Sequence, residues 1–284
     1  MLTVANTLMA DYFEDEARHR WLMLQGMVGS ILGSVTIVCS GFLASLGWQW
    51  PFAVYGVAFP IFLASYFYLY EPQPRTAGQK NEAPRAPATR FPYWVAIGIC
   101  AVTIVLSIIY YVQVIHFSVL LKDLGVSDPK SIGLAMAIPS LGVPIGSVIF
   151  KLTARFGAGT QIALVFLCYC IGLTGIGLAA DYKIALAFAF VQQLANGIIV
   201  PALIAWAQSK FNFEHRGRGM GWWASSFFAA QFLSPAFVNV VRAWTGGLQP
   251  AFVVFGVIAG ICALVAFLAK LRSAQPAVAA ASNP

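Results

Sequence analysis

Long apolar stretches alternate with short polar ones along the whole chain. Helix is the expected conformation for these stretches, because an unpaired backbone group in lipid costs several kcal/mol. Eight of them are long enough to cross about 30 Å of hydrocarbon as helices. The predicted spans run approximately from 21 to 46, 51 to 70, 93 to 121, 129 to 152, 159 to 180, 184 to 208, 218 to 243 and 249 to 271. The pattern predicts an all-α, polytopic membrane protein.

Polar segments divide this pattern into two parts. Residues 71–92, EPQPRTAGQKNEAPRAPATRFP, are rich in Pro and Ala and too polar to enter a bilayer. They predict a cytoplasmic linker between a first part, 1–70, and a second part, 93–272. Residues 1–10 resemble the tail of a further helix, and residues 273–284 predict a disordered tail.

An internal repeat relates residues 11–57 to residues 209–257. Phe13, Glu16, Arg18 and Arg20 align with Phe211, Glu214, Arg216 and Arg218 at an offset of 198, and Phe52, Gly56 and Val57 align with Phe252, Gly256 and Val257 at 200. An offset this long excludes a solenoid and suits a duplicated membrane bundle. Since three spans precede the repeat in the second part, the first part is expected to lack about 105 residues before Met1.

The composition supports lipid as the solvent of the chain. With 60% hydrophobic and 10% charged residues, the chain has more apolar surface than one soluble core can hide. The charges cluster between apolar runs, so the net charge of +7 leaves no basic face for nucleic acid. The five cysteines all lie in apolar runs at spacings that support neither a disulfide framework nor a zinc site.

The Lys and Arg residues are distributed unequally between the two membrane sides. Four lie on one side: Lys122, Lys130, Lys183 and Arg242. Thirteen lie on the other: Arg18, Arg20, Arg75, Lys80, Arg85, Arg90, Lys151, Arg155, Lys210, Arg216, Arg218, Lys270 and Arg272. The positive-inside rule places these thirteen and the C-terminus in the cytoplasm.

Two segments carry a family likeness. ADYFEDEARHRWLMLQG is similar to the end of transmembrane helix 4, the loop and the start of helix 5 in the major facilitator superfamily of secondary transporters, and GWQWPF is similar to its turn between helices 5 and 6. The resemblance extends over essentially the whole chain. It implies that residues 1–70 hold a helix 4 stub and helices 5 and 6, that residues 93–272 hold helices 7 to 12, and that helices 1 to 3 are absent.

The family's motifs are only partly present. Its loop signature after helix 8, an Asp-Arg pair followed by x-Gly, corresponds to Ala154-Arg155-Phe156-Gly157 and lacks the Asp. Its helix 5 antiporter pattern aligns with Thr36, Ile37, Ser40 and Gly41, so that only the last Gly remains. Helix 5 also carries Gly26, Gly29 and Gly33, a small-residue face that predicts close helix packing.

The resemblance implies a central cavity lined by helices 1, 4, 7 and 10. Its candidate residues share arcs of about 120° or less on their helices, with His116 at the edge of one arc. They are Ser107, Tyr110, Gln113, His116 and Phe117 in helix 7, Gln192, Gln193 and Asn196 in helix 10, and Trp223, Phe227, Gln231 and Ser234 in helix 11. The alternative is that the amides join neighbouring helices and that His116, Trp222 and Trp223 anchor the chain at the membrane interface.

A second set of charged residues lies in the loops. Such loops form cytoplasmic contacts in the family that open and close with alternating access, and Asp11 is similar to the acid that pairs there with an Arg of the helix 2 to 3 loop. The gate candidates are Asp11, Arg18, Arg20, Arg155, Arg216 and Arg218.

These observations predict a secondary active transporter that moves a small organic solute by alternating access, with export slightly favoured by the aromatic content. It would reside in the cell (inner) membrane, with a proton as the candidate coupling ion and no metal, nucleotide or redox cofactor. The alternatives are a nonfunctional remnant or a gene model begun at an internal Met. An intramembrane enzyme is disfavoured, because His19, His116 and His215 lack HExxH spacing and no acid lies within a span.

Overall fold

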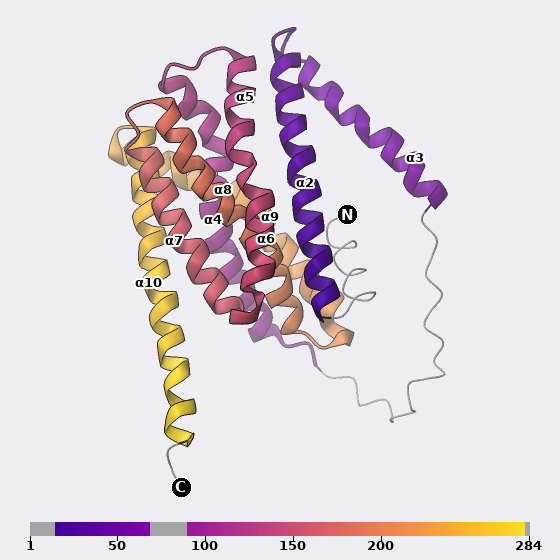
Figure 1. Cartoon of the computed structure of the whole chain (residues 1–284), viewed down its shortest axis with the longest axis vertical. Coiled ribbons are helices and arrows are strands. Elements are labelled where there is room, and N and C mark those ends of the chain that lie inside the picture. The colour runs from indigo at the N-terminus through magenta and orange to yellow at the C-terminus, as the bar shows by residue number, and fades with distance from the viewer. Residues whose placement is uncertain (1–14, 69–89, 282–284) are drawn as a thin grey trace.

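The computed structural model describes residues 15–68 and 90–281, and all regular structure in these two ranges is helical (Figure 1). Seven helical segments there are long and apolar enough to cross a membrane, which confirms the all-α polytopic prediction. The long helices are α2 (Asp15–Ala44), α4 (Tyr93–Asp123), α7 (Ala158–Gly177), α8 (Tyr182–Ser209), α9 (Phe213–Thr245) and α10 (Leu248–Ala281). The shorter ones are η1 (Trp50–Val57), α3 (Ala58–Tyr68), α5 (Pro129–Ser140), α6 (Gly142–Thr153) and η2 (Ala154–Phe156).

Three boundaries differ from the prediction. The span expected at 51–70 is divided into the 3-10 helix η1, with Pro51 in its first turn, and the short helix α3. The span expected at 129–152 is interrupted at Leu141, between Pro139 and Pro144, because a proline removes a backbone donor and clashes with the preceding turn. The structure extends α10 to Ala281, so residues 273–281 are helical rather than a disordered tail. Alanine, the strongest helix former, dominates this extension. The linker at 71–89, the helix 4 stub and residues 282–284 lie outside the described residues.

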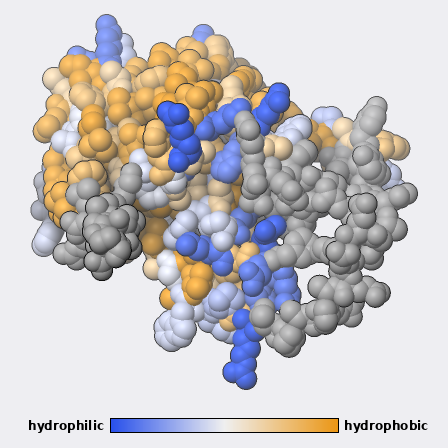
Figure 2. Space-filling model, turned by 60° about the horizontal axis from the view of Figure 1, so that its bottom comes forward, coloured by the Kyte–Doolittle hydropathy of each residue, from blue (hydrophilic) through white to orange (hydrophobic). Residues whose placement is uncertain are grey.

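Successive long helices run in opposite directions, so that their ends form two faces (Figure 1). We call the lower face in Figure 1 the basic end. Figure 2 brings this end forward and shows hydrophilic residues gathered there beside hydrophobic flanks. The basic residues of known placement at this end are Arg20, Arg90, Lys151, Arg155, Lys210, Arg216 and Arg218.

Glycines set the closest helix crossings in the bundle. A Cβ added at Gly146 of α6 would lie 2.0 Å from the Leu194 carbonyl oxygen of α8, and one added at Gly197 of α8 would lie 2.2 Å from the Val143 oxygen. Gly172 brings α7 similarly near to α8, at Gln192. In lipid, close van der Waals packing takes the place of the hydrophobic effect between helices. These glycines therefore determine how α6, α7 and α8 associate.

Helix α2 attaches to the bundle through small residues of α5 and α6. A Cβ at Gly41 would lie 3.0 Å from the Cα of Gly133, and the hydroxyls of Ser34 and Ser140 are 2.7 Å apart. Of the predicted face, only Gly26 meets a neighbour, the hydroxyl of Ser147. Gly29 and Gly33 have no described atom within 4 Å of an added Cβ. That part of the prediction is wrong, because the contact face of α2 follows Gly26, Ser34 and Gly41 instead.

The two copies of the repeat have different surroundings. In the second copy, α10 packs along α7, and a Cβ at Gly256 would lie 2.3 Å from the Thr174 hydroxyl. In the first copy, a Cβ at the equivalent Gly56 would have no described atom within 4 Å, and α3, which follows that copy, diverges from the bundle (Figure 1). The sequence likeness thus does not extend to equal packing.

Replacing Gly146 with Ala is expected to lower the stability of the protein by roughly 1–3 kcal/mol, because the added methyl group overpacks the crossing of α6 and α8. Thermal unfolding of the purified protein in detergent measures the change. Gly29→Ala is the matched control, since its methyl group meets open space and alanine favours a helix over glycine by up to about 1 kcal/mol. Equal melting temperatures for the two variants would contradict a glycine-set crossing.

Candidate functional site

An aromatic cluster joins α4 to α9 near the middle of the bundle. The ring centroids of Tyr110 and Tyr111 lie 4.9 Å apart, and each lies 5.6 Å from the ring of Phe227. Trp223 stacks on Phe227 at 5.6 Å. Trp223 is fully buried and Tyr110 is half-buried. Four rings of two helices therefore form one continuous aromatic surface inside the protein.

A chain of polar contacts joins α7 to α8 beside this cluster. The Tyr169 hydroxyl donates a hydrogen bond to Asn196 Oδ1 over 2.9 Å, and the Asn196 amide donates to Gln193 Oε1. Tyr169 is fully buried. The hydroxyl of Tyr169 thus lies where α7 meets the amides of α8. We call Tyr110, Tyr169, Gln192, Gln193, Asn196 and Trp223 the polar core.

Several buried polar atoms have no hydrogen-bond partner among the described residues. Both side-chain amide atoms of Gln192 belong to this group, although that residue has no exposed surface. The others are Thr103 Oγ1, Ser107 Oγ, Gln113 Oε1, His116 Nε2 and Trp223 Nε1. A buried polar group left unsatisfied costs about 1–3 kcal/mol, so most such groups in proteins are paired with protein, water or ligand. Protein groups among the described residues therefore do not explain these atoms.

The structure places the cavity candidates in three environments. Gln113, Gln192, Asn196 and Trp223 are buried within the bundle, whereas Tyr110, His116 and Gln193 are half-buried. Gln231 is exposed on the outer face of α9 and is not brought to the polar core. The burial of Trp223 contradicts its interpretation as an interface anchor. Ser234, also buried, donates to the Ile108 carbonyl oxygen over 3.0 Å and joins α9 to α4.

Sequence reasoning did not find Tyr169. It lies in the apolar run LVFLCYC of α7, where it is the one side chain with a strong hydrogen-bonding group. A phenol in such a run needs a buried hydrogen-bond partner, and this requirement could have identified Tyr169 from the sequence. Its partner Asn196 was a candidate, but periodicity within one helix gives no information about which helix faces it.

At the basic end, Arg218 lies in an aromatic cage. Its guanidinium carbon is 4.5 Å from the centroid of Phe91 and 5.2 Å from that of Tyr93, and its Nη2 donates to the Tyr93 hydroxyl over 2.9 Å. Phe91 also stacks on Phe211 with centroids 5.8 Å apart, and Trp222 lies 6.2 Å from both Phe91 and Tyr93. A cation on an aromatic face gains about 0.5–1 kcal/mol when exposed. The cage ties the residues before α4 to the start of α9.

The other gate candidates are not brought together into one site. Arg20 of α2 and Lys151 of α6 line one recess, while exposed Arg155 lies over the Phe156 ring at 4.7 Å. Arg216 is half-buried. Asp11 and the side chain of Arg18 lie outside the described residues. The described residues also contain no group of three or more His, Cys, Asp or Glu arranged to hold a metal ion.

Comparison with known families gives a match over nearly the whole chain. The family model of the Major Facilitator Superfamily matches residues 1–179 and, in a second alignment, residues 99–283. The comparison with curated proteins gives no match.

Removing the contact between Tyr169 and Asn196 is expected to reveal coupling between α7 and α8. We expect Tyr169→Phe and Asn196→Leu each to destabilise the protein, and the double variant to lose less than the two single losses combined. The difference should be about 0.6 kcal/mol, the mean for hydrogen bonds between membrane helices, and no more than about 1.7 kcal/mol, the largest value found for them. Reversible unfolding in mixed micelles measures it. Strict additivity would show that this hydrogen bond contributes nothing to the association of the two helices.

Proposed function

We propose that this chain, which belongs to the Major Facilitator Superfamily, is a secondary active transporter that carries a small organic solute by alternating access. The family consists of membrane transporters rather than enzymes, and the seven apolar helices fit a multi-pass membrane protein. Beyond the family assignment, we propose where the solute binds and what kind of solute it is.

One observation carries the proposal: buried side chains at membrane depth hold polar atoms without partners. Gln192 Oε1 and Nε2 and Trp223 Nε1 have no partner among the described residues, and polar groups within spans are costly enough that they commonly mark solute or ion pathways. Packing alone explains Asn196, whose hydrogen bonds are satisfied. It does not explain Gln192. We therefore assign Gln192 and Trp223 to solute binding and Tyr169 and Asn196 to holding α7 and α8 in place.

The chemistry of the polar core favours an amphipathic, aromatic solute. Its rings offer stacking surfaces, its amides and phenols both donate and accept hydrogen bonds, and its indole donates one. No span contains Lys, Arg, Asp or Glu away from its ends, so this part of the protein offers no formal charge to an ionic solute. These features support a neutral or weakly cationic organic molecule, with export slightly favoured.

Coupling and orientation are further parts of the proposal. His116 is the one side chain within the described spans, away from their ends, that can bind a proton near neutral pH, and it carries an unpartnered Nε2. We propose that the basic end faces the cytoplasm of the cell membrane, by the positive-inside rule, together with the C-terminus. At that end Arg20, Arg155, Arg216 and Arg218, together with Arg18 and Asp11, would form the gate.

The test is dye transport by the chain in proteoliposomes, with ethidium as the probe and an imposed proton gradient. We expect Gln192→Ala to raise the half-saturating dye concentration about fivefold, the equivalent of one lost hydrogen bond of about 1 kcal/mol. Gln249→Ala is the matched control, because the Gln249 amide donates to the Ala179 carbonyl oxygen over 2.8 Å at the end of the bundle away from the basic end, outside the polar core. It should leave the half-saturating concentration unchanged.

Two results would contradict this proposal. Equal effects of Gln192→Ala and Gln249→Ala would show that the buried amide acts on stability rather than on solute binding. Absence of transport for a panel of neutral and cationic aromatic dyes, by a protein that remains monodisperse, would contradict the solute class and the transport activity together.

A further inference from the structure

We propose that a recess on the flank of the bundle binds the acyl chain of an anionic phospholipid from the leaflet at the basic end. The recess has a volume of about 710 Å³ and lies between α4, α7, α8 and α10. It lies apart from the polar core, and none of the residues assigned to solute binding lines it. The inference does not depend on transport.

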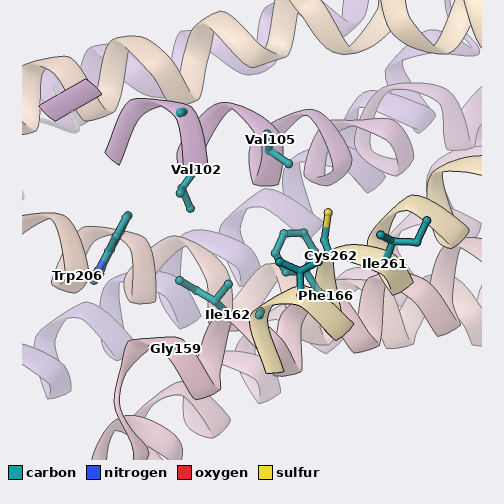
Figure 3. Close-up of a pocket in the computed structure, with 11 residues that line it drawn as sticks. Val102, Val105, Gly159, Ile162, Phe166, Trp206, Ile261 and Cys262 are labelled. Atoms are coloured by element: carbon teal, nitrogen blue, oxygen red, sulfur yellow. The ribbon is translucent and has the colours of Figure 1, made fainter. Parts of the chain in front are cut away.

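The lining of the flank recess is almost entirely hydrocarbon. Figure 3 shows Val102 and Val105 of α4 pointing across the space toward Ile162 and Phe166 of α7. The Trp206 ring lies at one end of the recess, and Ile261 and Cys262 of α10 lie toward the other. Such a surface offers no orienting groups to a polar solute. A flexible, apolar chain matches it.

The recess opens to the outside of the bundle rather than to its core. Val265 and Ile261 of α10 are 60% and 58% exposed, and Val105 of α4 is 45% exposed. Helix α10 lies on the flank opposite α2 (Figure 1). Each lining helix is a candidate membrane span, so the opening is at membrane depth. The molecules that meet it there are lipid tails.

Filling the space, rather than escape from water, favours a chain in this position. Lipid tails are as apolar as leucine, so no hydrophobic effect separates a bound chain from a free one. The walls of an unfilled space lose dispersion contacts outright. The volume is within the roughly 300–1,000 Å³ range of small-molecule sites, which is large enough for part of one chain.

Two basic residues give the recess a preference for a headgroup. Arg155 precedes the lining residue Gly159 by four positions, and Lys210 follows the lining residue Trp206 by four. Both side chains are exposed at the basic end. A lipid whose tail occupies the recess would bring its phosphate to this level, and each such cation favours an anionic surface about fivefold, the equivalent of about 1 kcal/mol.

The experiment uses the full chain in nanodiscs that contain a trace of phosphatidylglycerol or phosphatidylcholine with a diazirine in mid-chain. After photolysis, adducts are mapped by mass spectrometry. We expect them to concentrate on α4, α7 and α10 segments that line the recess. Val265→Trp should reduce this labelling at least threefold by filling the opening. Leu264→Trp is the matched control, since Leu264 is 58% exposed on the same helix but does not line the recess.

The headgroup is tested separately with Arg155→Gln/Lys210→Gln, with Lys122→Gln/Lys183→Gln at the opposite end as the matched control. The first pair should remove most of the preference for phosphatidylglycerol, and the second should retain it. Far-ultraviolet circular dichroism and size-exclusion elution establish that each variant is folded. Adducts spread evenly over the exposed faces, equal labelling of Val265→Trp and Leu264→Trp, or equal labelling by the two lipids in the parent protein would each overturn the proposal.

Discussion

The structure depends on one constraint: lipid supplies neither hydrogen bonds for the backbone nor a hydrophobic force between helices. The lack of hydrogen bonds from lipid makes each apolar run a helix, because only a helix pairs its own backbone groups within one segment. The lack of a hydrophobic force makes close packing the means by which the helices associate. Gly146 and Gly197 satisfy it at the crossing of α6 and α8, where an added Cβ would overlap the facing backbone. Elsewhere, large side chains must fill the space that wider helix separations leave.

The bundle accordingly contains two kinds of interface. Helices α6, α7, α8 and α10 meet through glycines such as Gly172 and Gly256. Helices α4 and α9 form a pair of their own that has fewer contacts with α8 and α10 than with each other. Rings fill the space within this pair, where Tyr110 and Tyr111 of α4 meet Phe227 of α9. The flank recess lies between α4 and the first group, against α7, α8 and α10. The boundary between the two groups is therefore less closely packed than the glycine crossings within the first group.

The sequence predicted the helical class, most span positions and the separation of charges between two ends, because apolar run length and loop charge act locally. Pro139 and Pro144 indicated an interruption of the span at 129–152, and the structure has it at Leu141. Pro201 indicated one in α8 as well, but that helix is continuous. The division of the span at Pro51 was not predicted. Whether a proline bends or ends a helix depends on what packs beside it. The pairing of Tyr169 with Asn196 could not be predicted either, because it depends on which faces of α7 and α8 meet. The glycines of α2 show the same limit: the spacing predicted a helix contact at Gly29, but the contact with α5 lies at Gly41.

The contrast between the two interfaces also bears on where a transporter of this kind can move. A crossing in which Cβ atoms have no room tolerates little sliding, because interiors packed to this density have few alternative arrangements. Offset rings such as Tyr110 and Phe227 can turn about their side-chain torsions and still remain in contact, and their polar neighbours exchange partners at small cost when a solute supplies hydrogen bonds. Movement of α4 and α9 as a pair against the group of α6, α7, α8 and α10 would therefore keep the ring contacts within the pair and disturb the less closely packed boundary at the flank recess. The unpartnered atoms of Gln113 and Trp223 belong to α4 and α9, so solute binding and movement of this pair would act on the same two helices.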